Sequence, residues 1–197
     1  MENSGHIVTD LIIKYSCQRI AEIGVERARC ARAVLRNEEA NKIVEEYWAI
    51  DSWKPLPHYL TLLEENKQFK RMGKRKAEEW KQFYMKALSY MAWFPQLKIV
   101  KLASKEAVTL FPKKYFPNGY FDIVYIDAEH TYEAVKQDIK LWWPLLRVGG
   151  ILCGHDYWDG EESGRYPGVN QAVDELLGKE NIKQLLNCTW LYKKRRI

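Results

Sequence analysis

Two groups of chemically active side chains stand close together in the second half of the chain. Asp127, Glu129 and His130 come directly after one apolar run, and His155 and Asp156 come directly after the next one. Carboxylates and imidazoles can move protons near neutral pH, orient a neighbouring base or hold a metal ion. Whether these five side chains can act together depends on the elements that carry them.

The residues around the two groups predict parallel strands joined by a helix. Residues 121–126 are a β-branched and aromatic run typical of a buried strand. Apolar residues recur at helical spacing over 135–142, and we expect Pro144 and the Gly149-Gly150 pair to end that helix and turn the chain into a strand at 151–153. A right-handed crossover would place both polar groups at the carboxyl ends of neighbouring strands, where open α/β sheets bind ligands.

The first half of the chain has a related pattern around a glycine. Residues 19–25 are strand-like up to Gly24, a helix follows, and a second strand at 47–50 ends on Asp51. Glu22 suits a ligand with an ammonium group better than a pyrophosphate, and Asp51 can accept hydrogen bonds from both ribose hydroxyls. The order favours an adenosine-type cofactor, and the missing GxGxxG motif argues against a nicotinamide dehydrogenase.

Periodicity predicts the remaining elements. They are a helix or extended arm at 7–15, a helix from Trp80 to Met91, a strand at 97–102 followed by a short helix up to Phe111, a helix from Val169 to Leu177 with Gly178 as its C-cap, and a hairpin of 182–186 with 189–193. The loop at 157–168 could close over a site.

Length and composition indicate one globular domain. The 197 residues are 47% hydrophobic and 29% charged, no apolar run approaches the roughly 20 residues of a membrane span, and no signal-peptide pattern opens the chain. The four cysteines lie far apart without a CxxC pair, which argues against a zinc site or a disulfide framework. We therefore expect a cytoplasmic protein.

The net charge of +5 is unevenly distributed. Basic residues crowd the segment 67–76 and the C-terminal segment 193–196, while the remainder of the chain is net acidic. Such patches could meet nucleic acid, phosphate-bearing substrates or a membrane surface. The alternative is a solvated helix face and a solubilising tail.

Four motifs together resemble one family. They are AEIGV (21–25), AIDSW (49–53), IDAEHTYEAV (126–135) and LLRVGGILCGHDYW (145–158). The chain looks like a class I S-adenosylmethionine-dependent methyltransferase, of the branch with IDxxHxY and HD motifs that is similar to the macrolide-sugar and cephalosporin-biosynthesis O-methyltransferases. The resemblance implies a Rossmann-like α/β fold with a seven-stranded, mostly parallel sheet in the order 3-2-1-4-5-7-6 and helices on both faces. It covers nearly all of a single domain over 1–197, apart from a helical basic insertion at about 54–79.

The resemblance also implies a binding site for S-adenosylmethionine. Glu22 and Gly24 would line its methionine end, Asp51 would hold the ribose, and Asp127 and Ala128 would lie beside the transferring methyl group. The full set of expected cofactor residues is Glu22, Ile23, Gly24, Val25, Asp51, Ser52, Trp53, Ala103, Ser104, Asp127, Ala128 and His130.

The resemblance to this family also implies catalytic and metal-binding roles. His155 is the preferred general base with Asp156 as its orienter, and His130 is either a second base or a brace for its turn. Asp127 and Asp156 stand where metal-dependent relatives bind Mg²⁺, but His155 is a poor magnesium ligand because Mg²⁺ prefers oxygen. Metal dependence therefore stays open.

The expected activity is O-methylation of a small molecule or sugar. Methylation of nucleic acid or protein through the basic run at 67–76 is an alternative, which is weakened because IDAE replaces the DPPY-type or NPPF-type tetrapeptide of amino-methylating enzymes. A non-catalytic cofactor-binding protein is a third, supported by Ala28 in place of a glycine and by His155. Homo-oligomerisation is left open.

Overall fold

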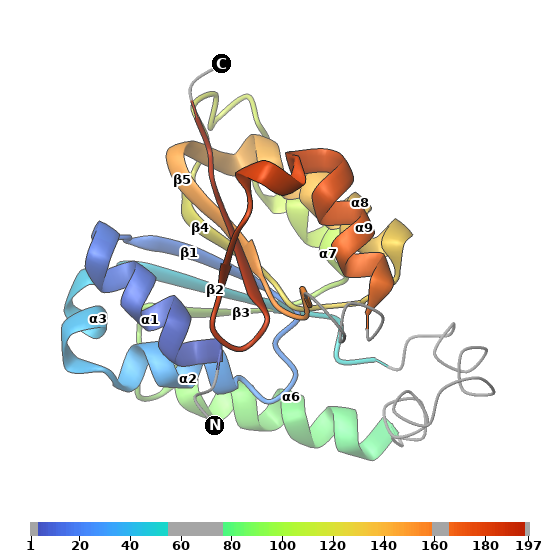
Figure 1. Cartoon of the computed structure of the whole chain (residues 1–197). Coiled ribbons are helices and arrows are strands. Elements are labelled where there is room, and N and C mark those ends of the chain that lie inside the picture. Colours follow the sequence, from blue (N-terminus) through green and yellow to red (C-terminus); the bar gives the residue numbers. More distant parts are fainter. Residues whose placement is uncertain (1–3, 55–76, 159–165, 196–197) are drawn as a thin grey trace.

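The structure is a computed structural model that describes residues 4–54, 77–158 and 166–195. One seven-stranded sheet runs through it in the order β3-β2-β1-β4-β5-β7-β6, which confirms the predicted order (Figure 1). Its strands are β1 (Arg19–Ile23), β2 (Glu46–Asp51), β3 (Leu97–Lys101), β4 (Phe121–Ile126), β5 (Leu146–Gly154), β6 (Lys183–Leu185) and β7 (Thr189–Lys193).

Strands β1 to β5 are parallel, and β7 is antiparallel to both β5 and β6. In the centre of the sheet, Glu22 pairs with Ala49 of β2 on one side and with Tyr125 of β4 on the other. The carboxyl ends of β1, β2, β4 and β5 therefore meet at one edge of the sheet.

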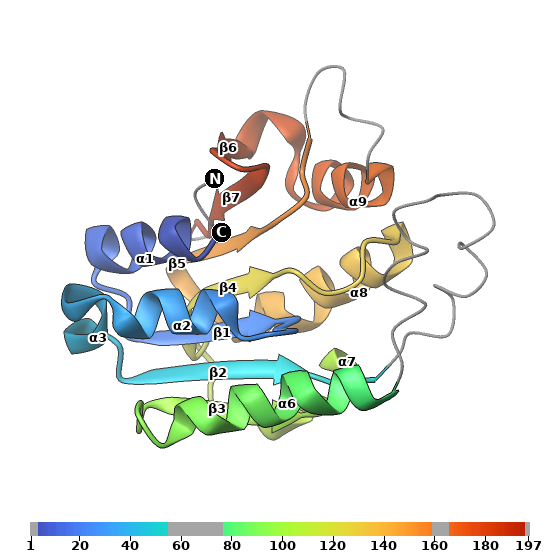
Figure 2. The same cartoon turned by 90° about the horizontal axis from the view of Figure 1, so that it is seen from below.

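Helices cover both faces of the sheet, as expected. They are α1 (Ser4–Tyr15), α2 (Arg29–Arg36), α3 (Glu38–Ile43), α6 (Ala77–Met91), α7 (Ser104–Ala107), α8 (Tyr132–Trp142) and α9 (Pro167–Leu177), with short 3₁₀ turns at Val108–Leu110, Trp143–Leu145 and Lys179–Asn181. Figure 2 shows α2 and α6 crossing one face of the sheet.

Two hydrophobic cores result, because successive strand residues point to opposite faces. Ile20 of β1 packs in the core that includes α1, α2 and α6. Its neighbour Ala21 packs in the core that includes α7, α8 and α9. Since both faces are covered, the central strands read as nearly continuous apolar runs.

The predicted turn at Gly149-Gly150 is wrong. Helix α8 ends at Trp142, a 3₁₀ turn carries Pro144, and the glycine pair lies inside β5. The amide of Gly149 donates to the carbonyl of Lys194, and the amide of Lys194 donates to the carbonyl of Gly150. The pairing with β4 shifts register here, so the glycines form an irregularity in a long strand instead of a turn.

Several boundaries differ from the prediction in smaller ways. The opening segment is a helix, α1, and a short helix that was not predicted, α3, follows α2. Asn37 ends α2 as expected, and its side chain also caps α3 by accepting from the amides of Glu39 and Ala40. The greater part of the predicted insertion at about 54–79, including the basic run at 67–76, lies outside the described residues, as does most of the 157–168 loop.

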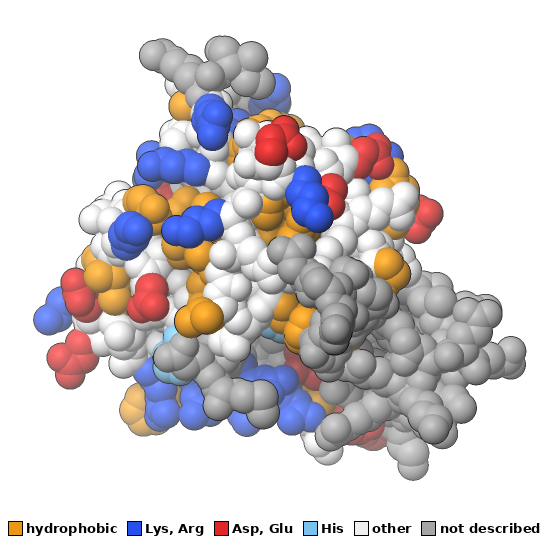
Figure 3. Space-filling view, in the orientation of Figure 1, with side chains coloured by type: hydrophobic (Ala, Val, Ile, Leu, Met, Phe, Trp, Pro, Cys, Tyr) orange, Lys and Arg blue, Asp and Glu red, His pale blue; other side chains and the backbone are white. Residues whose placement is uncertain are grey.

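The described part of the C-terminal basic segment is partly engaged in the fold. Lys194 Nζ donates to the carbonyls of Trp143 and Leu146 at 2.8 and 2.7 Å, and Lys193 Nζ lies 4.9 Å from the ring centre of Tyr15. Figure 3 shows Lys and Arg side chains at several separate places on the face in view. Among the helices that the structure describes, none has the length and apolar character of a membrane span.

Candidate functional site

The loop after β1 is the first wall of the site, and its backbone is unusual. Gly24 has a φ of +90°, and Glu26 and Ala28 have φ values of 48° and 54° in the left-handed region. Ala28 therefore occupies a conformation that favours glycine, at the position where the family pattern has one. A side chain on Gly24 would place its Cβ 2.2 Å from the carbonyl oxygen of Asp127. The close approach allowed by this glycine is to the backbone after β4.

Asp51 organises this loop from the end of β2. Its Oδ2 accepts hydrogen bonds from the amides of Val25 and Glu26, both at 2.9 Å, and its Oδ1 accepts from the amide of Trp53 at 2.7 Å. Ser52, which lies between Asp51 and Trp53 in the chain, is half-buried. A carboxylate offers about four lone-pair directions, so Asp51 can hold the loop and still accept another donor.

The side chain of Trp53 also holds the loop after β1. It is buried, has a φ of 46°, and its indole Nε1 donates to the carbonyl of Glu26 at 2.9 Å. Its ring lies 5.1 Å from the ring of Tyr84 in α6. The indole ring of Trp53 thus contacts both the loop and α6. Its expected place beside an adenine ring stays a prediction.

Glu22 is a buried carboxylate in the middle of the sheet. Its Oε2 accepts a hydrogen bond from Tyr47 Oη at 2.9 Å. Burial raises the pKa of Glu22 to about 8, and the hydrogen bond from Tyr47 limits that rise. The neighbouring Ile23 is also buried. A cationic group near Glu22 would favour its ionised form.

The side chain of Ser104 is hydrogen-bonded to two residues of α8. Its hydroxyl donates to the carboxylate of Asp138 in α8 and accepts from Trp142 Nε1 at 2.9 Å. Burial raises the pKa of Asp138 to about 7. The amide of the half-buried Ala103 donates to Glu106 Oε2 at 3.2 Å. Asp138 was not predicted, although an acid on the apolar face of a predicted helix is a signal for such a buried residue.

The two polar groups after β4 and β5 meet, as predicted. Asp156 Oδ2 lies 2.6 Å from His130 Nε2 and 3.3 Å from His155 Nδ1. Asp127 Oδ1 lies 3.8 Å from His130 Nε2 and 4.0 Å from His155 Nδ1. The fifth side chain, Glu129, lines the same cavity as Asp127, His130 and His155. The cavity measures about 10 Å³, close to the minimum for one water molecule.

His130 is enclosed without a well-aligned hydrogen bond. Its ring stacks on Tyr166 with ring centres 4.6 Å apart, and neither of its buried ring nitrogens has a hydrogen-bond partner among the residues that the structure describes. The 2.6 Å contact between His130 Nε2 and Asp156 Oδ2 therefore lies off the direction of a ring N–H bond. Such a group is costly to bury unless a ligand or ion uses it.

Interactions among the charged side chains of the cluster move their pKa values apart. Burial alone would lower the pKa of His155, but its contacts with Asp156 and Cys188 and the charge of Asp127 raise it to about 11. Burial would raise the pKa of Asp156, but His130 and His155 hold it well below its usual range. Burial raises the pKa of Asp127 to about 6, and the two imidazoles limit that rise.

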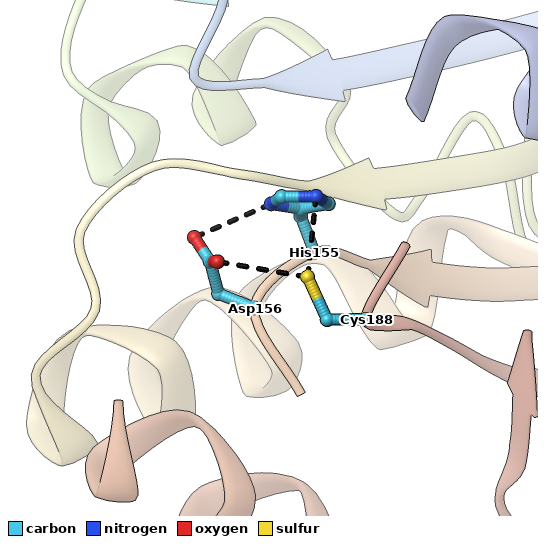
Figure 4. Close-up of side chains that lie close together, drawn as sticks. All are labelled: His155, Asp156 and Cys188. Carbon is cyan, nitrogen blue, oxygen red and sulfur yellow. Dashed lines mark hydrogen bonds and ion pairs between the residues drawn. The ribbon is translucent and has the colours of Figure 1, made fainter. Parts of the chain in front are cut away.

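A further side chain, Cys188, reaches the cluster from the turn between β6 and β7. Its Sγ lies 3.4 Å from His155 Nε2 and 3.8 Å from Asp156 Oδ1 (Figure 4). Nothing in the spacing along the chain indicated this meeting, because Cys188 is more than thirty residues from His155. The antiparallel insertion of β7 beside β5 brings it there.

The cluster does not fit Mg²⁺. Asp127 and Asp156 supply oxygen, but imidazole nitrogens lie between 2.6 and 4.0 Å from those oxygens and would share any ion bound there. Mg²⁺ demands near-octahedral oxygen coordination and keeps several waters. We therefore assign no role to magnesium.

Comparison with known proteins gives the family. A family model described as a methyltransferase domain matches residues 21–157. These residues contain the loop after β1 and the polar groups that follow β4 and β5. This chain belongs to the methyltransferase domain family. The match begins just before Glu22 and ends just after Asp156, so it contains the residues of the site with the exception of Cys188.

Solved structures share the fold of this methyltransferase domain. The O-methyltransferase NovP is 17% identical with a TM-score of 0.63, over 98% of this chain and 78% of that one. The calicheamicin methyltransferase CalS11 is also 17% identical, with a TM-score of 0.61 over 96% and 77%. A spermidine synthase from Thermotoga maritima is 14% identical with a TM-score of 0.57, over 97% and 58%. Because one fold carries these different activities, it does not by itself specify the acceptor.

A curated relative matches only part of the methyltransferase domain. The uncharacterized protein R132 of Acanthamoeba polyphaga mimivirus is 36% identical over 61 residues, which are 30% of this chain. The match spans 27% of the length of R132.

Proposed function

We propose that this methyltransferase domain uses S-adenosylmethionine to methylate a hydroxyl oxygen of a small molecule or sugar. The observation that carries the proposal is the meeting, at one edge of the sheet, of the Asp51-bound loop after β1 with the Asp127–His130–His155–Asp156 cluster. The first can hold a nucleoside, and the second can act on an acceptor proton. NovP is described as an O-methyltransferase and CalS11 as a TDP-rhamnose 3'-O-methyltransferase, which supports oxygen and a sugar as the acceptor.

The cofactor would extend along the carboxyl edge from β2 to β4. Glu22, Ile23, Gly24 and Val25 would line its methionine end, where the ammonium group would stabilise the ionised form of Glu22. The remaining contacts follow the predicted order. Asp51, Ser52 and Trp53 would bind the ribose and adenine. Ala103 and the backbone of Ser104 would lie beside the adenine, because the Ser104 side chain is bonded to α8. Asp127, Ala128 and His130 would lie near the methyl group.

Methyl transfer is an in-line displacement. The acceptor oxygen forms a bond to the methyl carbon, the sulfonium sulfur leaves with the bonding pair as a thioether, and the hydroxyl proton passes to a base. Positioning of donor and acceptor supplies much of the rate. The base must be unprotonated at neutral pH.

Asp127 is the base that the electrostatics favour. Its pKa of about 6 leaves it ionised at pH 7, whereas a pKa of about 11 keeps His155 protonated in this arrangement. His155, Asp156 and His130, the predicted catalytic residues, would then position Asp127 and the acceptor. A comparison of Asp127→Asn with His155→Ala tests the assignment. We expect Asp127→Asn to lower kcat by at least about 100-fold, the usual range for a general base, with cofactor affinity nearly unchanged. A larger fall in His155→Ala than in Asp127→Asn would return the role to His155.

Cofactor binding is the first experiment. Calorimetry should show S-adenosylmethionine and its demethylated product binding to the full chain with micromolar dissociation constants. Asp51→Ala should weaken both by at least about tenfold, because it removes a ribose acceptor and frees the loop amides. Asp10→Ala, which changes an exposed carboxylate of α1, is the matched control. If the unaltered chain binds neither compound, the proposed activity is wrong.

The nucleic-acid alternative stays a prediction, because the basic run at 67–76 lies outside the described residues. In the C-terminal basic segment, Lys194 is bonded to backbone carbonyls. Binding of oligonucleotides that weakens steeply with salt would revive it. The single domain over 1–197, a cytoplasmic location and homo-oligomerisation also stay proposals.

A further inference from the structure

We propose that the groove between α1 and α2 binds a small molecule that carries two or more phosphate groups. The groove measures about 490 Å³, which is within the range of small-molecule sites. Its polar lining residues are Arg29, Arg32, Arg36 and Asn37 in and after α2, with His6 and Thr9 of α1. None of them belongs to the expected cofactor residues or to the cluster after β4 and β5, so the inference does not rest on methyl transfer.

The three arginines lie along one face of α2. Their positions, i, i+3 and i+7, are neighbours on the surface of a helix. With a rise of 1.5 Å per residue, Arg29 and Arg36 are separated by about 10 Å along the helix axis. Each guanidinium is a planar fork of donors that matches the oxygens of a phosphate. Figure 3 shows Lys and Arg side chains gathered along the lower edge of the face in view, where α2 and α6 lie in Figure 1.

Most of the positive charge in the groove has no carboxylate beside it. Arg29 Nη2 pairs with Glu26 Oε2 at 3.1 Å. Arg32 Nη1 lies 3.4 Å from the hydroxyl of Tyr90 in α6, and Arg36 forms no ion pair with any residue that the structure describes. The described lining of the groove contains no Asp or Glu. A bound polyanion would therefore relieve the repulsion among these cations.

The other polar groups of the groove also suit an anion. Asn37 Oδ1 accepts from the amides of Glu39 and Ala40, which leaves the Asn37 Nδ2 group as a donor. His6 is an exposed imidazole that adds a positive charge when it is protonated.

Close helix packing fixes the two walls of the groove. A Cβ on Gly5 would lie 2.7 Å from the Cβ of Ala33 and 3.1 Å from the Cα of Cys30, so this glycine allows α1 to approach α2 directly. The two helices lie side by side in Figures 1 and 2. Inside α1, the Thr9 hydroxyl donates to the carbonyl of Gly5 at 2.6 Å. A preformed groove lowers the cost of ordering the protein around a ligand.

Exposed acidic residues limit the length of the basic stripe. Asp10 follows Thr9 in α1, and Glu38 and Glu39 follow Asn37 at the start of α3. An extended polyanion such as a nucleic-acid strand would meet these carboxylates, whereas a compact ligand with two or three phosphates would not. The charge pattern therefore favours a small phosphorylated molecule over nucleic acid.

The test is calorimetry on the full chain at low ionic strength, with inorganic pyrophosphate and tripolyphosphate as probes. Each titration is repeated with the demethylated product of S-adenosylmethionine in excess, and a single-stranded oligonucleotide is titrated in parallel. The variant is the double substitution Arg32→Gln and Arg36→Gln. The matched control is Lys105→Gln with Lys140→Gln, which removes the same charge from exposed positions of α7 and α8. Far-ultraviolet circular dichroism checks the fold, and Arg36→Gln alone provides the answer if the double variant does not fold.

We expect one probe molecule for each chain, with a dissociation constant below about 1 mM for pyrophosphate and a lower one for tripolyphosphate. The double variant should bind at least about tenfold more weakly, because two charged donors are lost, and the control should bind as the wild type does. Absence of saturable binding, or equal weakening in the control, would overturn the site. Competition by the demethylated product would place the anion in the cofactor site instead. An oligonucleotide that binds more tightly than tripolyphosphate, and loses affinity in the double variant, would replace the small molecule with nucleic acid.

Discussion

Replacing Glu22 with glutamine should make the stability of the free protein less dependent on pH and should weaken its cofactor binding. The side chain is 2% exposed, and its Oε2 accepts a hydrogen bond from Tyr47, which the amide oxygen of glutamine can also accept. Burial raises the pKa of Glu22 from 4.5 to about 8, so the folded chain holds a proton that the unfolded chain loses near pH 4.5. The stability that this proton confers is complete below about pH 4.5 and is lost as the pH rises through 8.

The size of the effect follows from that shift. At about 1.36 kcal/mol for each pKa unit, ionising Glu22 in the unfolded state alone costs the wild type about 1 kcal/mol of stability at pH 5 and about 3 kcal/mol at pH 7. Glu22→Gln escapes this cost. The additional amide N–H groups of glutamine add a penalty that does not depend on pH, so the change between the two pH values is the diagnostic quantity.

Urea unfolding, followed by tryptophan fluorescence at pH 5, 6 and 7, measures the difference. We expect the free energy of unfolding of Glu22→Gln, relative to wild type, to become more favourable by about 2 kcal/mol from pH 5 to pH 7. Glu39→Gln, at an exposed glutamate of α3, should show no such trend. Calorimetry should show weaker binding of S-adenosylmethionine to Glu22→Gln, because an amide cannot balance an ammonium charge. A stability difference that is the same at all three pH values would refute the reasoning.

Three further substitutions have clear expected outcomes. Asp138→Asn should stabilise the chain by about 4 kcal/mol above pH 7 and by little at pH 4. Burial raises the pKa of Asp138 to about 7, so the wild type becomes less stable as the pH rises from 4 to 7. Urea unfolding at both pH values measures the difference. Gly24→Ala should lower the free energy of unfolding, measured in urea, by at least about 2 kcal/mol more than Gly149→Ala does. Both glycines have positive φ, but the nearest atom to the added Cβ is 2.2 Å away at Gly24 and 4.0 Å away at Gly149. Lys194→Met should lose about 2 kcal/mol in thermal unfolding, since two backbone carbonyls lose a charged donor.

The sequence predicted the fold well because the sheet is covered on both faces. Strands such as β4 are buried at every residue and are apolar except for Asp122, and helices such as α8 carry one apolar stripe. The prediction failed at Gly149-Gly150, where glycines that are typical of a turn serve a strand irregularity instead. Local composition cannot distinguish these cases, because both need a backbone freed from a side chain.

The candidate site was predictable only where its residues follow strand ends. Asp127, His130, His155 and Asp156 met as expected, because neighbouring parallel strands end at the same edge. Cys188 was missed because its approach depends on the register of an antiparallel strand from elsewhere in the chain. The orientation of Ser104 toward α8 was equally inaccessible, since it depends on one buried carboxylate across a core.

The position of β7 has a consequence for the biosynthesis of the protein. Because β7 lies between β5 and β6, the edge of β5 has no partner while the ribosome has yet to deliver residues 189–193. During that interval a long apolar strand exposes unpaired amides and carbonyls, which other nascent chains can use as a template. A chain cut after residue 182 is therefore expected to scatter light and to bind a holdase chaperone, whereas the full chain is not; a clear, monodisperse truncated chain would contradict this. Translation speed across the β6–β7 hairpin would then influence how much of the protein escapes aggregation.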